Sequence, residues 1–188
     1  DGIANRLDDE HFALDLYRRF IQMHASVVMS APGSLFEETL EDLRCRASVE
    51  SVNGLSTGEM RIAIERFKRI VVDAVGTDVP DEPVIQLRNA IEAVFSSWNT
   101  RRAIDYRNFH GIPHDLGTAV NVQAMVFGNM DDDSSTGVLF TRDPSTGEKT
   151  LYGEYLVNAQ GEDLVAGIAT PRNIERMAVE NPEMHRRV

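Results

Sequence analysis

The chain has 188 residues, of which 42% are hydrophobic and 26% charged, and these values are ordinary for a folded globular protein. Its formal net charge of -11 opposes binding to a nucleic-acid backbone, and the single cysteine, Cys45, excludes an internal disulfide and a thiolate metal cluster. No apolar run approaches the roughly 20 residues that a membrane-spanning helix needs, and no signal-peptide pattern is present, so we expect a cytoplasmic protein without a membrane partner.

The first two-thirds of the chain is predicted to be helical. Over residues 9–29, apolar side chains recur at three- and four-residue spacing, which indicates a helix with one buried stripe. The members of that stripe are Phe12, Leu16, Phe20, Met23 and Val27. Pro32 and Gly33 end this helix, and the capping-box spacing of Ser34 and Glu37 predicts a second, short helix after them.

Three more helices are predicted before residue 113. Ser56 and Glu59 repeat the capping-box spacing, and Gly76 suits the left-handed end of the helix that they begin. Pro83 marks the start of the next helix. The predicted buried face of that helix consists of Leu87, Ile91, Val94 and Trp98. A shorter helix is predicted over residues 100–109.

Beyond Pro113 the pattern changes from helical to strand-like. Apolar side chains alternate over residues 118–127, so a strand is predicted there. Two further strands are predicted over residues 136–143 and 151–158. The acidic segment between the first two strands has the character of a long hairpin turn, and residues 173–188 are again helical in pattern.

These elements predict the α+β fold class. Residues 1–112 are expected to form a mostly helical portion, and residues 113–188 a strand-rich portion with an antiparallel sheet. The chain begins at Asp1 without an initiator methionine and ends on a polar, basic tail without a stop signal. We therefore expect it to be a piece of a longer protein.

The predicted strand over residues 118–127 is the first candidate for binding chemistry. Gln123 and Met125 lie on one side of it, two residues apart. An extended segment can recognise adenine through its backbone N–H and C=O groups while apolar side chains sandwich the ring. An amphipathic strand of this kind is more often part of a core.

A polar segment after the third predicted strand is the second candidate. It contains Asn158, Gln160, Glu162 and Asp163, with Gly161 and Gly167 freeing the backbone. Carboxylates beside glycine can accept hydrogen bonds from ribose hydroxyls or approach a magnesium ion. The alternative is a solvated loop, since acidic side chains are mostly exposed.

Arg142, at the end of the second predicted strand, is the third candidate. Its fork of donors matches phosphate oxygens, although an ion pair with Asp143 or Glu148 explains it equally well. The run 131–133 of three aspartates lacks the ligand spacing of a calcium loop and is better interpreted as a solvated turn. The five histidines are scattered, and neither a Walker-type loop nor a dinucleotide fingerprint is present.

Three segments, read in order, resemble the nucleotide-binding domain of the pyruvate, phosphate dikinase family. They span residues 117–130, 136–148 and 152–163, the last containing Asn-Ala-Gln-Gly-Glu-Asp. The resemblance implies an ATP-grasp-like fold, in which two α+β lobes hold ATP, and places the smaller lobe or lid among the helices before residue 113. By the same resemblance, the residues that bind ATP are Gln123, Ala124, Met125 and Val126 at adenine, and Glu162 and Asp163 near the ribose.

The resemblance also implies an activity for the full-length enzyme, which is a phosphotransferase. It passes phosphate from ATP to a catalytic histidine on a separate phosphohistidine domain and then forms phosphoenolpyruvate from pyruvate. Mg2+ is the implied cofactor, and the full-length enzyme is expected to be a homodimer. The family's lysine and arginine for the ATP phosphates, and its metal-binding residues, correspond to positions outside these 188 residues. The fold is therefore expected to be incomplete at both ends, with no catalytic residue or metal ligand in this chain, which alone should be inactive.

Three positions depart from the family pattern. Asp131 and Ser135 replace glycines between the first two predicted strands, which implies a changed turn, and Ala169 replaces an arginine. Two other interpretations remain. The chain could be the nucleotide domain of a phosphoenolpyruvate synthase or an antibiotic phosphotransferase, although the wording of residues 158–163 favours the dikinase. It could also be a noncatalytic module that docks a partner through its acidic surface.

Overall fold

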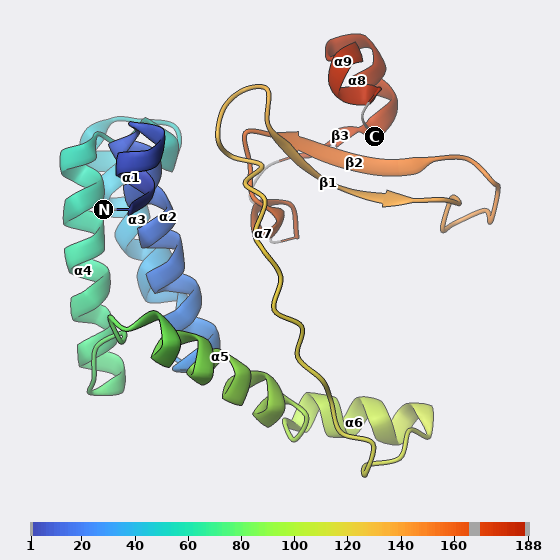
Figure 1. Ribbon diagram of the computed structural model, residues 1–188, viewed down its shortest axis with the longest axis horizontal. Coiled ribbons are helices and arrows are strands. Elements are labelled where there is room, and N and C mark those ends of the chain that lie inside the picture. Colours follow the sequence, from blue (N-terminus) through green and yellow to red (C-terminus); the bar gives the residue numbers. More distant parts are fainter. Residues whose placement is uncertain (1, 166–169, 187–188) are drawn as a thin grey trace. The chain divides into compact units, whose positions relative to one another are not determined.

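The computed structural model of the chain describes residues 2–165 and 170–186. They form an α+β protein with several helices and a small antiparallel sheet, as predicted (Figure 1). The chain divides into two compact units, Asp1–Val122 and Gln123–Val188. The predicted division after residue 112, into a mostly helical portion with the smaller lobe and a strand-rich ATP-binding portion, stays a prediction. Among the described residues, no helix has both the length and the apolar content to cross a membrane.

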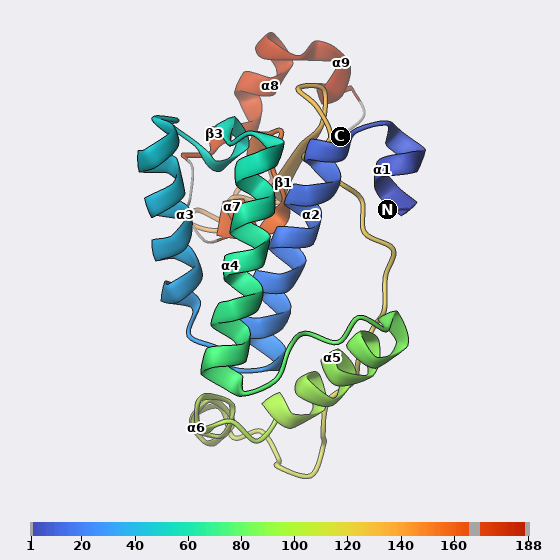
Figure 2. The ribbon, with the colours of Figure 1, turned by 90° about the vertical axis from the view of Figure 1, so that its left-hand side faces the viewer.

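The first unit is helical. Its elements are α1 (Gly2–Leu7), α2 (Glu10–Met23), η1 (His24–Val28), α3 (Gly33–Ala47), η2 (Val52–Gly54), α4 (Thr57–Val75), α5 (Pro83–Ser97) and α6 (Arg101–His110). The π-helical turn η1 directly continues α2, which confirms the helix predicted over residues 9–29. Helix α4 packs against both α2 and α3 (Figure 2).

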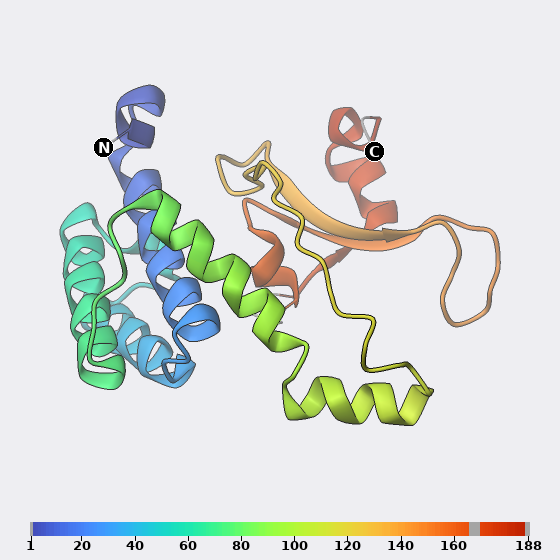
Figure 3. The same ribbon diagram turned by 60° about the horizontal axis from the view of Figure 1, so that its bottom comes forward.

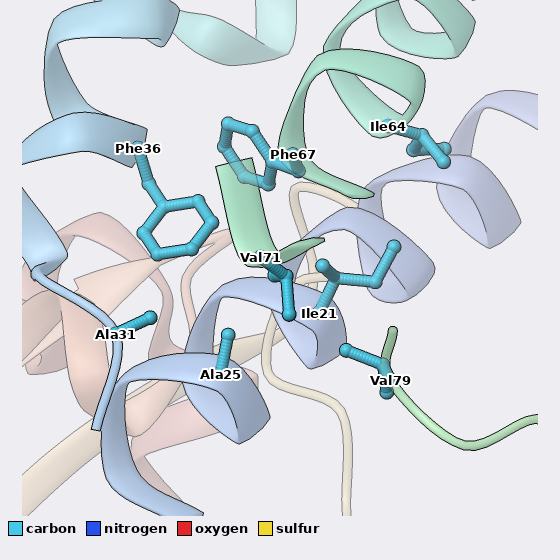
Figure 4. Packing of buried hydrophobic residues seen from close by; sticks show 8 residues of the cluster. All are labelled: Ile21, Ala25, Ala31, Phe36, Ile64, Phe67, Val71 and Val79. Carbon is cyan, nitrogen blue, oxygen red and sulfur yellow. The ribbon is translucent and has the colours of Figure 1, made fainter. Parts of the chain in front are cut away.

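The core of this unit lies between α2, α3 and α4. One buried cluster of this core consists of Ile21, Ala25, Ala31, Phe36, Ile64, Phe67, Val71 and Val79 (Figure 4), and a second consists of Leu43, Leu55, Met60 and Ala63. The rings of Phe36 and Phe67 meet edge to face, with 4.8 Å between their centroids. The predicted stripe of α2 is wrong at its C-terminal end, because Met23 and Val27 are exposed while Ile21 and Ala25 are buried. The helix therefore turns a face to the core that is offset from the predicted one.

Capping explains where α4 begins. The backbone N–H of Glu59 donates to Ser56 Oγ at 3.3 Å, and Glu59 Oε2 accepts from the backbone N–H of Ser56 at 2.7 Å, which confirms the predicted capping box. Gly76 ends the helix with φ 83°, as predicted. The box predicted at Ser34 is wrong, because α3 begins at Gly33 after Pro32 and has no side-chain cap.

Replacing Ser56 by alanine is expected to lower the free energy of unfolding by about 1 kcal/mol, since a helix donor then loses its partner. Urea unfolding followed by circular dichroism measures this loss. Ser51→Ala is the matched control, because Ser51 precedes η2 without a side-chain cap and should tolerate the change. Equal stability of the two variants would show that the Ser56 hydroxyl does not contribute.

Helix α5 departs from its prediction. None of its residues is buried, and Leu87 and Val94, two members of the predicted buried face, are 45% and 40% exposed. Helix α5 lies beside η1 (Figure 3). Together with the end of α2 and η1, it borders an apolar groove of about 570 Å³. Periodicity shows which side chains share a face, whereas burial also depends on a neighbouring element that covers that face.

The second unit contains the sheet. Its elements are β1 (Ser135–Phe140), β2 (Tyr152–Val157), α7 (Gly161–Val165), β3 (Arg172–Asn173), α8 (Ile174–Glu180) and α9 (Pro182–His185). The strands pair antiparallel in the order β1-β2-β3, with Ser135 opposite Val157 and Phe140 opposite Tyr152. This confirms the predicted strands over residues 136–143 and 151–158 and the helical pattern after residue 173.

The strand predicted over residues 118–127 is wrong. In the described part of the chain these residues are assigned to no strand, and their backbone pairs with none of β1, β2 and β3. Alternating apolar residues indicate an extended backbone, but a strand also needs an edge with which to exchange hydrogen bonds.

Candidate functional site

The loop that follows β2 is fastened to the turn that precedes β1. The backbone N–H of Asn158 donates to Ser134 O at 2.8 Å, and the next N–H, of Ala159, donates to Gly128 O at 2.9 Å. Asn158 adopts a left-handed backbone, with φ 50°, which asparagine tolerates better than most residues. The loop therefore leaves the sheet in a fixed direction.

Gly128 allows the backbone of the turn to approach the backbone of the loop closely. A β-carbon at this position would lie 2.5 Å from Ala159 O and 2.7 Å from Ser135 O, well inside normal contact. Both obstacles are backbone atoms, which cannot rotate away as a side chain can. Glycine is the residue that fits, because it has no β-carbon.

Two buried amide side chains add a direct link between the turn and the loop. Gln160 Nε2 donates to Asn129 Oδ1 at 3.2 Å, and the residues are 5% and 9% exposed. We call Asn129 and Gln160 the amide pair. Gln160 is among the polar candidates of the sequence, whereas Asn129 is not. The sequence signal that could have identified Asn129 is its position directly after an extended segment and a glycine.

The adjacent carboxylates Glu162 and Asp163 have different surroundings. Asp163 is buried, and its Oδ2 accepts the backbone N–H of Gln160 at 2.8 Å, so it holds the first turn of α7. Glu162 is exposed at the surface of the same turn. The structure thus gives Asp163 an internal contact and presents Glu162 to the outside.

The extended segment over residues 123–126 ends beside this loop. Gln123, Ala124, Met125 and Val126 are all exposed. The segment stops two residues before Gly128, whose carbonyl is bonded to Ala159, and three before Asn129, which is bonded to Gln160. The structure therefore brings together the end of the predicted adenine segment and the loop that carries Glu162 and Asp163.

Arg142 lies elsewhere. It follows β1 at the end opposite Ser135 and thus away from the loop, and its Nη1 donates to Gly147 O at 3.1 Å. Asp143 stabilises the same turn, since its Oδ1 accepts the backbone N–H of Ser145 at 2.7 Å. The structure does not bring Arg142 to the residue 158–163 loop, and its contact with phosphate stays a prediction.

The three aspartates before β1 form a hydrogen-bonded turn. Asp131 Oδ1 accepts the hydroxyl of Ser134 at 2.7 Å, and Asp132 Oδ1 accepts Nδ2 of Asn158 at 3.3 Å. Over residues 2–165 and 170–186, no three His, Cys, Asp or Glu side chains are grouped to hold a metal ion. The departure at Ala169 lies outside the described residues.

A hydrogen-bonded cluster joins the far side of the sheet to α8. Glu180 Oε2 accepts the hydroxyl of Tyr155 at 3.0 Å and Nη1 of Arg172 at 2.7 Å. Hydrogen bonds from Arg172 and Tyr155 lower the pKa of Glu180, whereas burial and the bond to Glu180 raise the pKa of the Tyr155 hydroxyl. These two hydrogen bonds fix α8 against the sheet.

The fold and the candidate site define an α+β protein in which a polar loop and an extended segment meet beside a short antiparallel sheet. A family model described as "Pyruvate phosphate dikinase, AMP/ATP-binding domain" matches residues 23–188. The chain belongs to this family.

Curated relatives agree with this assignment. The chain is 57% identical to pyruvate, phosphate dikinase of Rhizobium meliloti (strain 1021) over 177 residues, which are 94% of the chain and 20% of that protein. It is 51% identical to the chloroplastic pyruvate, phosphate dikinase 1 of Arabidopsis thaliana, over 98% of the chain and 19% of that protein. The enzyme of Clostridium symbiosum is 47% identical, over 99% of the chain and 21% of that protein. The chain thus spans about a fifth of the length of these relatives.

Proposed function

We propose that the chain binds ATP as the nucleotide-binding portion of a pyruvate, phosphate dikinase. The observation that carries this proposal is the fastening of residues 128–129 to residues 159–160, which brings the two candidate segments together. Membership of the AMP/ATP-binding family supports it independently. Relatives at 47% to 57% identity carry the dikinase name, which favours that enzyme over a phosphoenolpyruvate synthase or an antibiotic phosphotransferase.

The proposed contacts follow the chemistry of the exposed groups. The backbone of residues 123–126 hydrogen-bonds the edge of adenine, and the side chains of Met125 and Val126 supply apolar contact with the ring. The carboxylate of Glu162 accepts hydrogen bonds from ribose hydroxyls, while Asp163 acts beside it by holding the start of α7. Arg142 is retained as a candidate phosphate contact.

We further propose an ATP-grasp-like arrangement in which the helices before residue 113 include the smaller lobe. Mg2+ accompanies ATP, but the described residues do not fit a resident magnesium site, because that ion needs several oxygen ligands in one place. The metal ligands, the charged groups on the ATP phosphates and the phosphohistidine domain would belong to the longer protein. That protein, proposed as a cytoplasmic homodimer, would transfer phosphate from ATP to its histidine and then to pyruvate. Since positioned charge supplies most of the catalysis in phosphoryl transfer, the chain alone should bind without turnover.

Calorimetric titration of Mg·ATP into the chain tests this proposal, with Mg·GTP and AMP as comparison ligands. We expect saturable binding that favours adenine over guanine. Glu162→Ala should weaken ATP binding about tenfold, the usual effect of losing a hydrogen bond to a charged group.

Glu154→Ala is the matched control, because Glu154 is exposed in β2 of the same unit, away from the loop. It should bind as the unaltered chain does. Equal affinity of the Glu162 variant and this control would remove Glu162 from the site. An unaltered chain that binds no nucleotide would contradict the proposed function.

A further inference from the structure

The two halves of the proposed nucleotide site are held differently. Residues 158–163 are continuous with β2 and α7 and are fixed by three successive hydrogen bonds, from Asn158, Ala159 and Gln160. The segment 123–126 pairs with no strand within the described ranges, and its side chains are exposed. The hydrogen bonds at Gly128 O and Asn129 Oδ1, two and three residues further along the chain, hold its C-terminal end.

We infer that the amide pair, Asn129 and Gln160, consists of positioning residues that hold the 123–126 segment in register with the 158–163 loop and so set the selectivity for the nucleotide base. This inference rests on the proposed ATP binding. Neither residue is assigned a contact with the nucleotide. They act through the backbone that they hold.

The geometry supports a positioning role for the amide pair rather than a general role in packing. Gln160 takes part in two links in different directions, because its side chain donates to Asn129 Oδ1 at 3.2 Å and its backbone N–H donates to Asp163 Oδ2 at 2.8 Å. One residue thus connects the anchor of the 123–126 segment to the first turn of α7, which carries Glu162. A shift of Asn129 would move the base-recognising backbone relative to the ribose contact.

Both side chains are buried, so the link cannot be replaced by water without rearrangement. A fixed register matters most for the base, because adenine and guanine differ in the donors and acceptors at the edge that a backbone segment contacts. Contacts with ribose and phosphate are common to the two nucleotides. Loss of the amide pair should therefore reduce the preference for adenine more than it reduces nucleotide binding in general.

The test compares three forms of the chain: unaltered, Asn129→Ala and Gln160→Met, the last keeping the side-chain length without the donor. Titration with Mg·ATP and Mg·GTP is expected to show about fivefold weaker ATP binding in both variants, with GTP binding little changed, so that the ratio of affinities narrows. Tyr155→Phe is the control, because it removes the hydrogen bond to Glu180, which lies in the same unit but away from the site. Its affinity ratio should not change.

A second measurement does not depend on nucleotide. Backbone heteronuclear NOE values for residues 123–126 should fall in Asn129→Ala and Gln160→Met but not in Tyr155→Phe, since the hydrogen bond between Gln160 and Asn129 is lost in the first two alone. Unchanged NOE values in both amide variants would overturn the inference, whether or not ATP binds. If the unaltered chain binds no nucleotide, the proposed function fails, and the NOE comparison still decides whether the amide pair positions the segment. If ATP binds and the affinity ratio stays constant in the variants, the pair does not set selectivity.

Discussion

Replacing Asp15 by alanine is expected to lower the free energy of unfolding of the helical unit by about 3–5 kcal/mol, because it leaves a buried cation without its partner. Asp15 and Arg18 are 5% and 4% exposed. Asp15 Oδ1 accepts from Arg18 Nη2 at 2.6 Å, and Oδ2 accepts from Arg19 Nε at 2.8 Å. In the variant the Arg18 guanidinium would keep Gln22 Oε1, at 3.2 Å, as a neutral acceptor.

Urea unfolding monitored by helical circular dichroism measures this loss. Asp105→Ala is the matched control, since Asp105 pairs with Arg101 on the surface of α6, and an exposed ion pair contributes little. Similar unfolding midpoints in the two variants would contradict the importance of the buried pair.

The contribution of the Asp15 carboxylate to the free energy of unfolding is expected to depend on pH. Burial raises the pKa of Asp15, but the charges and hydrogen bonds of Arg18 and Arg19 outweigh it and hold the pKa below its ordinary value. The stabilisation is therefore fully present above the unfolded-state pKa of about 4 and is lost as the pH falls toward the folded-state pKa. We expect the gap in stability between the unaltered chain and Asp15→Ala to narrow below about pH 4. A gap that stays constant down to pH 3 would show that the pKa of Asp15 is the same in the folded and the unfolded protein.

Gly128→Ala is expected to destabilise the sheet-containing unit by about 3 kcal/mol, since overpacking against backbone atoms cannot be relieved by a side-chain rotation. The added β-carbon would meet Ala159 O at 2.5 Å and Ser135 O at 2.7 Å. Relief requires the loop to move away from the turn, which would break the bond from Ala159 N–H to Gly128 O. NMR signals of β1 and β2, followed through urea unfolding, report on this unit alone.

Gly161→Ala is the control in the same loop. A β-carbon there has Thr136 Oγ1 as its nearest neighbour, at 3.8 Å, which is ordinary contact. We expect this variant to unfold at nearly the same urea concentration as the unaltered chain. If Gly128→Ala does the same, the backbone around residue 128 has more freedom than the structure indicates.

Local signals were sufficient for much of the fold. Ser56 with Glu59 and the left-handed Gly76 determine the limits of α4 through neighbouring hydrogen bonds, so sequence spacing could predict them. The exposure of α5 could not be predicted, because it depends on which elements pack against that helix. The prediction of a strand over residues 118–127 was wrong for a related reason. The alternation of apolar side chains does not indicate whether another strand is available for pairing.

The candidate site was predictable in composition but not in geometry. The polar residues between Asn158 and Asp163 stood out in the sequence. The inward direction of Asp163 depends on its hydrogen bond with the backbone N–H of Gln160. This contact could not be predicted from the sequence, because the cap position holds neither serine nor threonine. The bond from Gln160 to Asn129 joins residues 31 positions apart, and no spacing rule connects such a pair.

The tight approach at Gly128 has a consequence for the gene. Every missense change in its codon adds a β-carbon, so the position has no conservative replacement. Two codons earlier, Val126 is 91% exposed and should accept many side chains without loss of folding. A deep mutational scan selected for folded protein should therefore show a sharp change in tolerance over three consecutive codons, with missense changes strongly depleted at the third.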